Sequence, residues 1–315
     1  EKNKSYSLVA VSDIKFSKNH IYKKKISYFR YYEDLIKNIK LDAVFVTLPN
    51  YLASKVTIKC IKKELHVFCE KPPAKNVQEV KGIIKTLKKY PKLKIKYGFN
   101  HRYHSSVKLA KKIILGRKYG DIINIRCLYG KSKIVTFGEE EWRSKKKFAG
   151  GGILLDQGIH LLDLLRFFNG DFHEFKSFIS NKFWGYDVED NAFALMRDKK
   201  GVIASIHSTA TQWQHKFRIE IALRYALLEL TGILSGSKSY GRESLNLIPR
   251  FSQSTKDSKN KKKYTYKNDN SWKEEIDEFA NLIIKNLPVK TGNIEDALKV
   301  MLMVKDIYYA DKKWR

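Results

Sequence analysis

The sequence predicts an α/β fold in which a doubly wound parallel sheet is followed by an α+β domain built on a largely antiparallel sheet. Strand-like and helical segments alternate over the first hundred residues, whereas later strand-like segments follow one another without helices between them. A chain of 315 residues with 43% hydrophobic residues is long enough for two domains with separate cores. We expect the boundary near residue 98, which gives domains 1–98 and 99–315.

The first domain should contain the parallel sheet. Residues 7–12 (SLVAVS) are a short apolar run ending in Asp13, a pattern typical of a buried parallel strand. Helical segments long enough for right-handed crossovers separate the strands that follow, so these strands should run parallel. The later strands are expected at 42–48, 66–69 and 94–98, and the helices at 32–38, 53–63 and 77–89.

The second domain should combine helices with an antiparallel sheet, because several of its strand-like segments are consecutive. The expected helices are 105–115, 152–168, 272–286 and 294–311. The expected strands are 122–129, 172–181, 191–197, 202–211, 217–222 and 226–231, and the lysine-rich stretch 252–270 should be an exposed loop.

Asp13 is a candidate cofactor ligand. In a Rossmann-like, dinucleotide-binding sheet, an acidic residue ends the second strand about 20 residues after a glycine-rich turn and binds the adenosine ribose. Counting back by that distance passes residue 1, so the first strand and the glycine turn should lie upstream of this sequence. The alternative is that Asp13 only forms a turn. A carboxylate here favours NAD, while Lys15 and Lys18 leave NADP open.

The net charge of +29 is the most prominent feature of the composition. Nucleic-acid-binding proteins gather basic residues on one face, whereas here 50 of the 62 basic residues are lysines spread over the chain. We therefore expect no nucleic-acid partner, but a field that attracts an anionic substrate. Three scattered cysteines without a CxxC pair favour a reduced, cytoplasmic setting, and no apolar run reaches the ~20 residues needed to span a membrane.

Lys71 is a candidate catalytic residue. The segment 70–72 (EKP) follows the expected strand 66–69, at the edge where ligands bind in open α/β sheets. A lysine there can donate to a substrate hydroxyl and stabilise the alkoxide as the proton leaves. The alternative is an ordinary surface lysine, and only the position of Lys71 favours catalysis.

The segment 150–163 (GGGILLDQGIHLLD) carries a candidate acid–base pair, Asp156 and His160. Four residues apart, the two side chains would share one face of a largely buried helix, where a carboxylate and an imidazole need a role or a partner. Histidine suits proton transfer at neutral pH, and Asp156 would orient it. A satisfied Asp–His pair in the core is an equal alternative. A metal site is a weaker one, because no further ligand cluster is evident and no metal is expected.

Taken in order along the chain, these motifs resemble the Gfo/Idh/MocA family of nicotinamide-dependent sugar oxidoreductases. The resemblance covers nearly the whole sequence and includes 48–50 (LPN), 69–72 (CEKP), 100–102 (NHR) and 141–143 (EWR). It implies that Lys71 is the catalytic lysine, beside the cofactor and the substrate, and that Asp156 and His160 are the acid–base pair. Further residues near the cofactor are implied to be Pro49, Asn50, Glu70, Arg102, Trp142 and Arg143.

The resemblance implies hydride transfer between NAD(P) and a hydroxyl or keto carbon of a sugar, nucleotide-sugar or cyclitol, in a homodimer or homotetramer. Trp213 either stacks on the sugar or packs at a sheet edge or subunit contact. Two other functions stay open: an NAD-dependent glycosidase that uses transient oxidation, and a non-catalytic sensor. The chain departs from the family in lacking the glycine turn and in having 51–53 (YLA) where a histidine is common.

Overall fold

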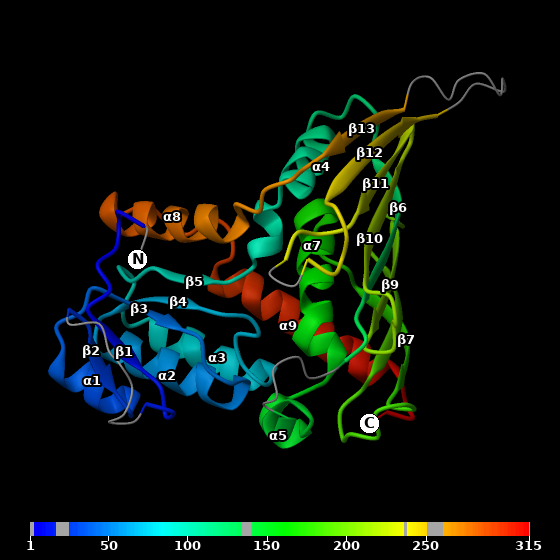
Figure 1. Ribbon diagram of the computed structural model, residues 1–315. Helices are drawn as coiled ribbons and strands as arrows, with labels where there is room; N and C mark the ends of the chain where they lie inside the picture. Colours follow the sequence, from blue (N-terminus) through cyan, green and yellow to red (C-terminus); the bar gives the residue numbers. More distant parts are fainter. Residues whose placement is uncertain (1–2, 17–24, 134–139, 236–237, 251–260, 315) are drawn as a thin grey trace.

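The computed structural model describes residues 3–16, 25–133, 140–235, 238–250 and 261–314. Figure 1 shows a parallel α/β part, which holds the first hundred residues, beside a second part with one large sheet. This is the predicted fold class.

The first part contains five parallel strands in two groups. Strand β1 pairs with β2, and β3, β4 and β5 form a separate sheet in that order. Asn76 begins the third helix as an N-cap, its side chain accepting a hydrogen bond from the backbone N–H of Glu79. The strands are β1 Ala10–Ser12, β2 Ser27–Phe29, β3 Ala43–Val46, β4 His66–Cys69 and β5 Ile95–Tyr97, and the helices are α1 Tyr32–Asn38, α2 Asn50–Lys62 and α3 Val77–Leu87.

A slot separates the two groups of parallel strands. It is a cavity of about 770 Å³, lined by residues 5–12 on one side and 40–48 on the other. A doubly wound sheet has the strand order 3-2-1-4-5-6, and β2-β1 followed by β3-β4-β5 matches this order with the first strand absent. The slot therefore lies between β1 and β3, at the position that the first strand holds in a doubly wound sheet.

The second part is built on an eight-stranded sheet with the order β13-β12-β11-β10-β6-β9-β8-β7. Neighbours in this sheet are antiparallel except β6 and β9, which run parallel. Buried and exposed residues alternate along β8 and β10, so one face of the sheet is covered. The strands are β6 Ile122–Gly130, β7 Glu174–Ser180, β8 Asn191–Arg197, β9 Ile203–Thr209, β10 Lys216–Leu223, β11 Ala226–Thr231, β12 Ser244–Pro249 and β13 Lys262–Thr265.

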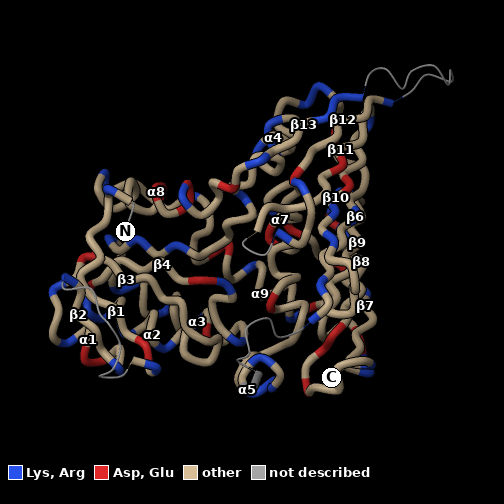
Figure 2. Tube along the Cα trace, viewed as in Figure 1, with Lys and Arg blue, Asp and Glu red and all other residues tan. Residues whose placement is uncertain are grey.

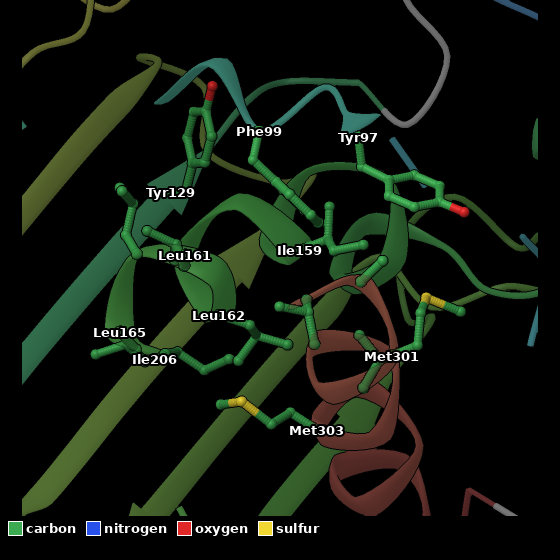
Figure 3. Close-up of a cluster of buried hydrophobic side chains, with 14 of the residues drawn as sticks. Tyr97, Phe99, Tyr129, Ile159, Leu161, Leu162, Leu165, Ile206, Met301 and Met303 are labelled. Atoms are coloured by element: carbon green, nitrogen blue, oxygen red, sulfur yellow. The ribbon is translucent and has the colours of Figure 1, made fainter. Parts of the chain in front are cut away.

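Helices α7 and α9 lie on the covered face of this sheet (Figure 1). Figure 3 shows Leu162 and Leu165 of α7 facing the side chain of Met303 from α9 and Ile206 from β9, all of which are buried. The remaining elements are the 3₁₀ turn η1 Asn100–Tyr103, α4 Ser105–Leu115, α5 Glu140–Arg143, α6 Lys146–Ala149, the π-helical turn η2 Leu154–Gly158, α7 Ile159–Asn169, α8 Ser271–Ile284 and α9 Ile294–Ala310.

One helix from beyond the expected domain boundary packs on the first sheet. Phe279 of α8 lies 5.9 Å from Phe45 of β3 and 5.7 Å from Phe68 of β4, measured between ring centroids. Figure 1 shows α8 on the side of the parallel sheet opposite α2 and α3. The chain therefore returns near its C-terminus to cover the sheet that its N-terminal half begins.

Three strands differ from the sequence-based prediction. The pattern predicts no strand at β2 or β12, and it predicts an exposed loop across β13; residues 251–260 of that loop lie outside the described residues. All four residues of β13 are exposed, so the strand is held by backbone pairing with β12 rather than by burial. Without an apolar alternation, such a strand leaves no periodic signal.

Lys and Arg are distributed along the whole trace in both parts of the molecule (Figure 2). The three cysteines are all buried and unpaired. Among the described helices, none combines the length and the apolar character needed to cross a membrane.

Candidate active site

Lys71 lies just past the end of β4, where the carboxyl ends of the parallel strands meet the second part of the molecule. Its Nζ donates to the main-chain oxygen of Asp156 at 2.5 Å and lies 3.9 Å from the carboxylate Oδ1 of the same residue. Burial lowers the pKa of the Lys71 ammonium, an effect opposed by the carboxylates of Asp156 and Glu70. The lysine that the sequence singles out therefore faces the glycine-led segment from the other half of the chain.

The glycine segment is held in place from both sides. Gly150 has the left-handed φ of +86°, and a Cβ there would lie 2.3 Å from the main-chain oxygen of Lys75. The buried carboxylate of Glu189 accepts hydrogen bonds from the backbone N–H groups of Gly152 at 2.7 Å and Leu154 at 2.8 Å. From the first part, Asn50 Nδ2 donates to the main-chain oxygen of Ala149 at 2.7 Å. These contacts fix the segment that leads into Asp156.

Asp156 lies in the π-helical turn η2 rather than in a regular α-helix. Its carboxylate Oδ2 accepts a hydrogen bond from Lys131 Nζ at 2.9 Å. Burial would raise the pKa of Asp156, but the charges of Lys131 and Lys71 outweigh burial and leave this pKa well below its usual value. Asp156 is therefore ionised at neutral pH.

His160 is the second residue of α7. Its ring is stacked on that of His101, with 3.7 Å between the ring centroids. Its Nδ1 is buried without a hydrogen-bond partner among the described residues. Burial and the positive charge of Lys71 hold the pKa of His160 well below its usual value, so the imidazole is neutral at neutral pH. His101 is itself held between Asn100 Oδ1 at 3.1 Å and the Tyr129 hydroxyl at 3.2 Å.

The sequence predicts that Asp156 orients His160, but among the described residues the two side chains have other partners. The regular helical spacing assumed for 156 and 160 is interrupted by the π-helical turn, which rotates one residue relative to the other. The Asp156 carboxylate bonds to Lys131, and the ring of His160 is positioned by stacking on His101. Lys71, Asp156 and His160 nevertheless act electrostatically on one another, so the three side chains converge on one site.

Several residues with implied cofactor roles line one small pocket beside this site. Asn50, Trp142, Arg143 and Asp156 form its wall together with the glycine segment. The Arg143 guanidinium lies 4.2 Å from the centroid of the Trp142 ring, and the Trp142 indole N–H is buried without a partner in the described residues. Pro49 directly precedes α2 as its N-cap residue.

Asp13 and Glu70 stand at the ends of two parallel strands. Asp13 follows β1, and its Oδ1 accepts from the backbone N–H of Lys15 at 2.8 Å, which is a turn contact; the second oxygen leaves acceptor capacity. Glu70 follows β4 with its carboxyl over Gly98, where a Cβ would approach Glu70 Oε2 to 2.9 Å. Burial raises the pKa of Glu70 despite the adjacent Lys71.

Arg102, for which the resemblance implies a place near the cofactor, is bonded to acidic side chains of two helices. Its guanidinium donates to both carboxylate oxygens of Asp163, at 2.8 and 2.6 Å, and also to Asp296 at 2.9 Å and Thr291 at 2.7 Å. Four of its five donors are thus taken up by protein groups inside the fold. Arg102 thus joins η1 to α7 and α9.

Trp213 lies on the loop between β9 and β10 and is 62% exposed. Its ring packs against Phe183 in a T-shaped arrangement at 4.9 Å. On the same loop, the backbone N–H of Gln212 donates to the main-chain oxygen of Lys131 at 3.0 Å. The aromatic pair is therefore connected through this loop to the lysine that binds Asp156.

Three residues shape the site in ways that the sequence-based prediction does not give. Lys131 has no part in that prediction, His101 enters it only within the segment 100–102, and Glu189 only within a segment between strands that either lines the sugar pocket or forms a turn. Lys131 is one lysine among 50, and its approach to Asp156 depends on the pairing of β6 with β9. His101 stands inside the segment 100–102, but nothing in that segment indicates that its ring stacks on His160. For Glu189, the glycine run at 150–152 could have suggested that a buried acceptor was needed for its N–H groups.

Two family models match the chain. Residues 1–99 match the model described as oxidoreductase family, NAD-binding Rossmann fold, and residues 107–227 match the GFO/IDH/MocA C-terminal domain. The chain belongs to the Gfo/Idh/MocA family. Both matches fall in the order that the sequence motifs predict.

Curated relatives of this Gfo/Idh/MocA chain include dehydrogenases of different substrates. Glucose-6-phosphate 3-dehydrogenase of Bacillus subtilis is 31% identical over 135 residues, which are 42% of this chain and 38% of the relative. Myo-inositol 2-dehydrogenase of Thermotoga maritima is 27% identical over 226 residues, 68% of this chain and 64% of the relative. The matched segments thus span less than two thirds of either relative.

Solved structures agree with the fold. Levoglucosan dehydrogenase in complex with NADH and levoglucosan superposes with a TM-score of 0.76 at 20% identity, covering 91% of this chain and 83% of that one. The WlbA dehydrogenase from Bordetella pertussis, in complex with NADH and UDP-GlcNAcA, gives a TM-score of 0.74 at 18% identity, covering 90% and 81%. At these identities the likeness shows the fold alone.

Proposed function

We propose that this protein catalyses reversible hydride transfer between NAD(P) and a hydroxyl or keto carbon of a sugar, nucleotide-sugar or cyclitol. The observation that carries the proposal is the convergence of Lys71 and His160, from separate domains of the chain, on one site at the carboxyl edge of the parallel strands. Its relatives support a dehydrogenase acting on CH–OH groups, since those named above act on a sugar phosphate and an inositol.

The chain's own residues supply proton handling and orientation. His160 is neutral and has a buried nitrogen without a partner, so it can accept the proton of a substrate hydroxyl. The Lys71 ammonium donates to the same hydroxyl oxygen and stabilises the developing alkoxide. The carboxylate of Asp156 opposes the desolvation that lowers the pKa of Lys71, and the main-chain oxygen of Asp156 accepts a hydrogen bond that orients Nζ. All three residues would touch the substrate.

Residues around the carboxyl edge of the parallel strands are suited to the two ends of the cofactor. The unpartnered indole N–H of Trp142, in the pocket with Asn50 and Arg143, suits a carbonyl acceptor such as the nicotinamide carboxamide. Asp13 has a carboxylate oxygen available for the adenosine ribose and favours NAD over NADP. When bound, the nicotinamide supplies hydride acceptance. The turn that would hold its pyrophosphate is not among the described residues.

Replacing Lys71 with methionine tests the catalytic assignment. Lys71→Met should lower turnover of any accepted sugar at least about a hundredfold, because a charged donor to the reacting oxygen is lost. NADH affinity, measured by fluorescence titration, should change little. The matched control is Lys75→Met, a partly exposed lysine four residues on. Near-normal turnover of Lys71→Met would remove Lys71 from the mechanism.

The same assays distinguish the other functions that the sequence left open. Release of a sugar without accumulation of NADH would indicate glycoside cleavage by transient oxidation. NADH binding without turnover on a broad sugar panel would indicate a sensor. The titration should be made on this chain and on the chain extended by a strand and a glycine turn before residue 1, because the slot between β1 and β3 should receive such a strand.

We further propose a cytoplasmic homodimer or homotetramer that associates through the uncovered face of the large sheet. Phe178 on β7, Phe193 and Leu195 on β8 and Ile203 on β9 are exposed large apolar residues on adjacent strands, with Phe178 81% exposed. Phe178→Asp should shift the molar mass measured by light scattering toward the monomer. An unchanged mass would exclude this face as the interface.

A further inference from the structure

Lys131 is a buried cation whose position is fixed by the backbone on both sides. Its N–H donates to the main-chain oxygen of Thr209 at 2.9 Å, and its oxygen accepts from the N–H of Gln212 at 3.0 Å. The side chain is only 9% exposed and ends 2.9 Å from the carboxylate of Asp156. Because both backbone groups are bonded, to the last residue of β9 and to the loop that follows it, the main chain of Lys131 is held beside Asp156.

The charges around Asp156 are unbalanced. The carboxylate lies within ion-pair distance of both Lys131 and Lys71. The other carboxyl beside Lys71 is that of Glu70, in which burial favours the neutral form. The ammonium groups of Lys131 and Lys71 thus share one ionised carboxylate, in a site where the side chains of Lys131, Lys71 and Asp156 are 9%, 20% and 28% exposed.

The Lys131 ammonium retains donors for a ligand. It carries three N–H groups, and its hydrogen-bond partner among the described residues is one oxygen of Asp156. A neutral sugar would occupy these donors with hydroxyls but would leave the excess charge uncompensated in a desolvated site. An anionic group would both accept the hydrogen bonds and balance the charge.

We infer that Lys131 is a specificity-determining residue that binds a carboxylate or phosphate carried by the substrate close to its reacting hydroxyl. This inference rests on the proposed function, because it takes Lys71 to mark the reacting oxygen. Lys131 and Lys71 share one carboxylate, so the anionic group lies within a few bonds of that oxygen. A sugar acid or a sugar phosphate meets this condition, whereas a charge carried only on a distant nucleotide does not.

Calorimetric titration with small sugars tests the inference without relying on turnover. Glucuronate, glucose 6-phosphate, glucose and inorganic phosphate are titrated into the protein in the presence and absence of NADH. At least one of the two anionic sugars should bind about tenfold or more tightly than glucose, which corresponds to one charge-assisted hydrogen bond. The first two arms distinguish a carboxylate from a phosphate, and the phosphate arm measures the contribution of the anion alone.

Three variants link any preference to Lys131. Lys131→Met should abolish the preference for the anionic sugar, Lys131→Arg should retain part of it, and Lys133→Met, an exposed lysine two residues on, should retain all of it. Thermal melting confirms that each variant is folded, and if Lys131→Met is not, Lys131→Gln replaces it. Equal binding of glucose and both anionic sugars overturns the inference, as does a preference that survives in a folded Lys131 variant lacking the charge.

The outcomes separate this inference from the proposed function. An anion preference that depends on Lys131, in a protein that forms no NADH with any sugar, would support the inference and refute the dehydrogenase. NADH formation from glucose and from glucuronate at equal efficiency, with no effect of Lys131→Met on their ratio, would do the reverse.

Discussion

The buried ion pair between Arg102 and Asp163 offers the sharpest test of how η1 is joined to α7. The Asp163 side chain is fully buried, the Arg102 side chain is 6% exposed, and the two share bonds of 2.6 and 2.8 Å. In Asp163→Asn the amide can keep one bond to the guanidinium, but its NH₂ group faces a second donor. Each charge-assisted bond contributes about 1.5–3 kcal/mol, and breaking a buried pair typically costs about 3–5 kcal/mol.

Since Arg102 retains Asp296 and Thr291, we expect the free energy of unfolding to fall by about 3 kcal/mol, at the lower end of that range. For a chain of 315 residues this corresponds to a fall in melting temperature of roughly 4–5 °C. Urea denaturation monitored by tryptophan fluorescence measures the change, and the double variant Arg102→Met with Asp163→Leu serves as control.

The double variant should be less destabilised than Asp163→Asn, because replacing both partners by apolar groups leaves no charge unpaired. A loss of less than about 1 kcal/mol in Asp163→Asn would refute the reasoning, because it would mean that water or another group compensates Arg102. A specific loss of NADH affinity in a folded Arg102→Met protein would instead restore Arg102 to the cofactor site.

Two further predictions concern the glycine segment and the stacked histidines. Gly150→Ala should destabilise the protein more than Gly201→Ala. Both residues have left-handed φ values, +86° and +88°, but a Cβ at Gly150 would lie 2.3 Å from the Lys75 oxygen, whereas a Cβ at Gly201 would meet open space. Equal melting temperatures of the two variants would contradict this. Burial holds the folded pKa values of His101 and His160 below the ordinary value of 6.5, so their contribution to stability is complete above that pH and is lost as the pH falls, at about 1.4 kcal/mol per pH unit for each histidine. His101→Phe should make the free energy of unfolding fall less steeply between about pH 6 and 5, by about 1.4 kcal/mol per pH unit. An unchanged slope in urea denaturation would show that the pKa of His101 is not lowered in the folded protein.

Local signals in the sequence predicted most of the fold. The helix Tyr32–Asn38 and the strand His66–Cys69 form over the predicted residues, and the alternation of strands and helices predicts the parallel sheet. Such features depend on neighbours within a few residues, since side-chain periodicity and crossover length are properties of short segments. The weakest elements, β2 and β13, have no periodic pattern and form only because a partner strand lies beside them.

The sequence by itself determined the family and the candidate catalytic residues, because Lys71 follows a strand at the ligand-binding edge and Asp156 and His160 stand in one short motif. Only the tertiary structure decided which charges meet. It brings Lys131 to Asp156, 25 residues away in the sequence, and Arg102 to Asp163, 61 residues away. It also stacks His101 on His160. A charged side chain carries no record of its partner in its own sequence neighbourhood, because the partner is chosen by how strands pair and helices pack.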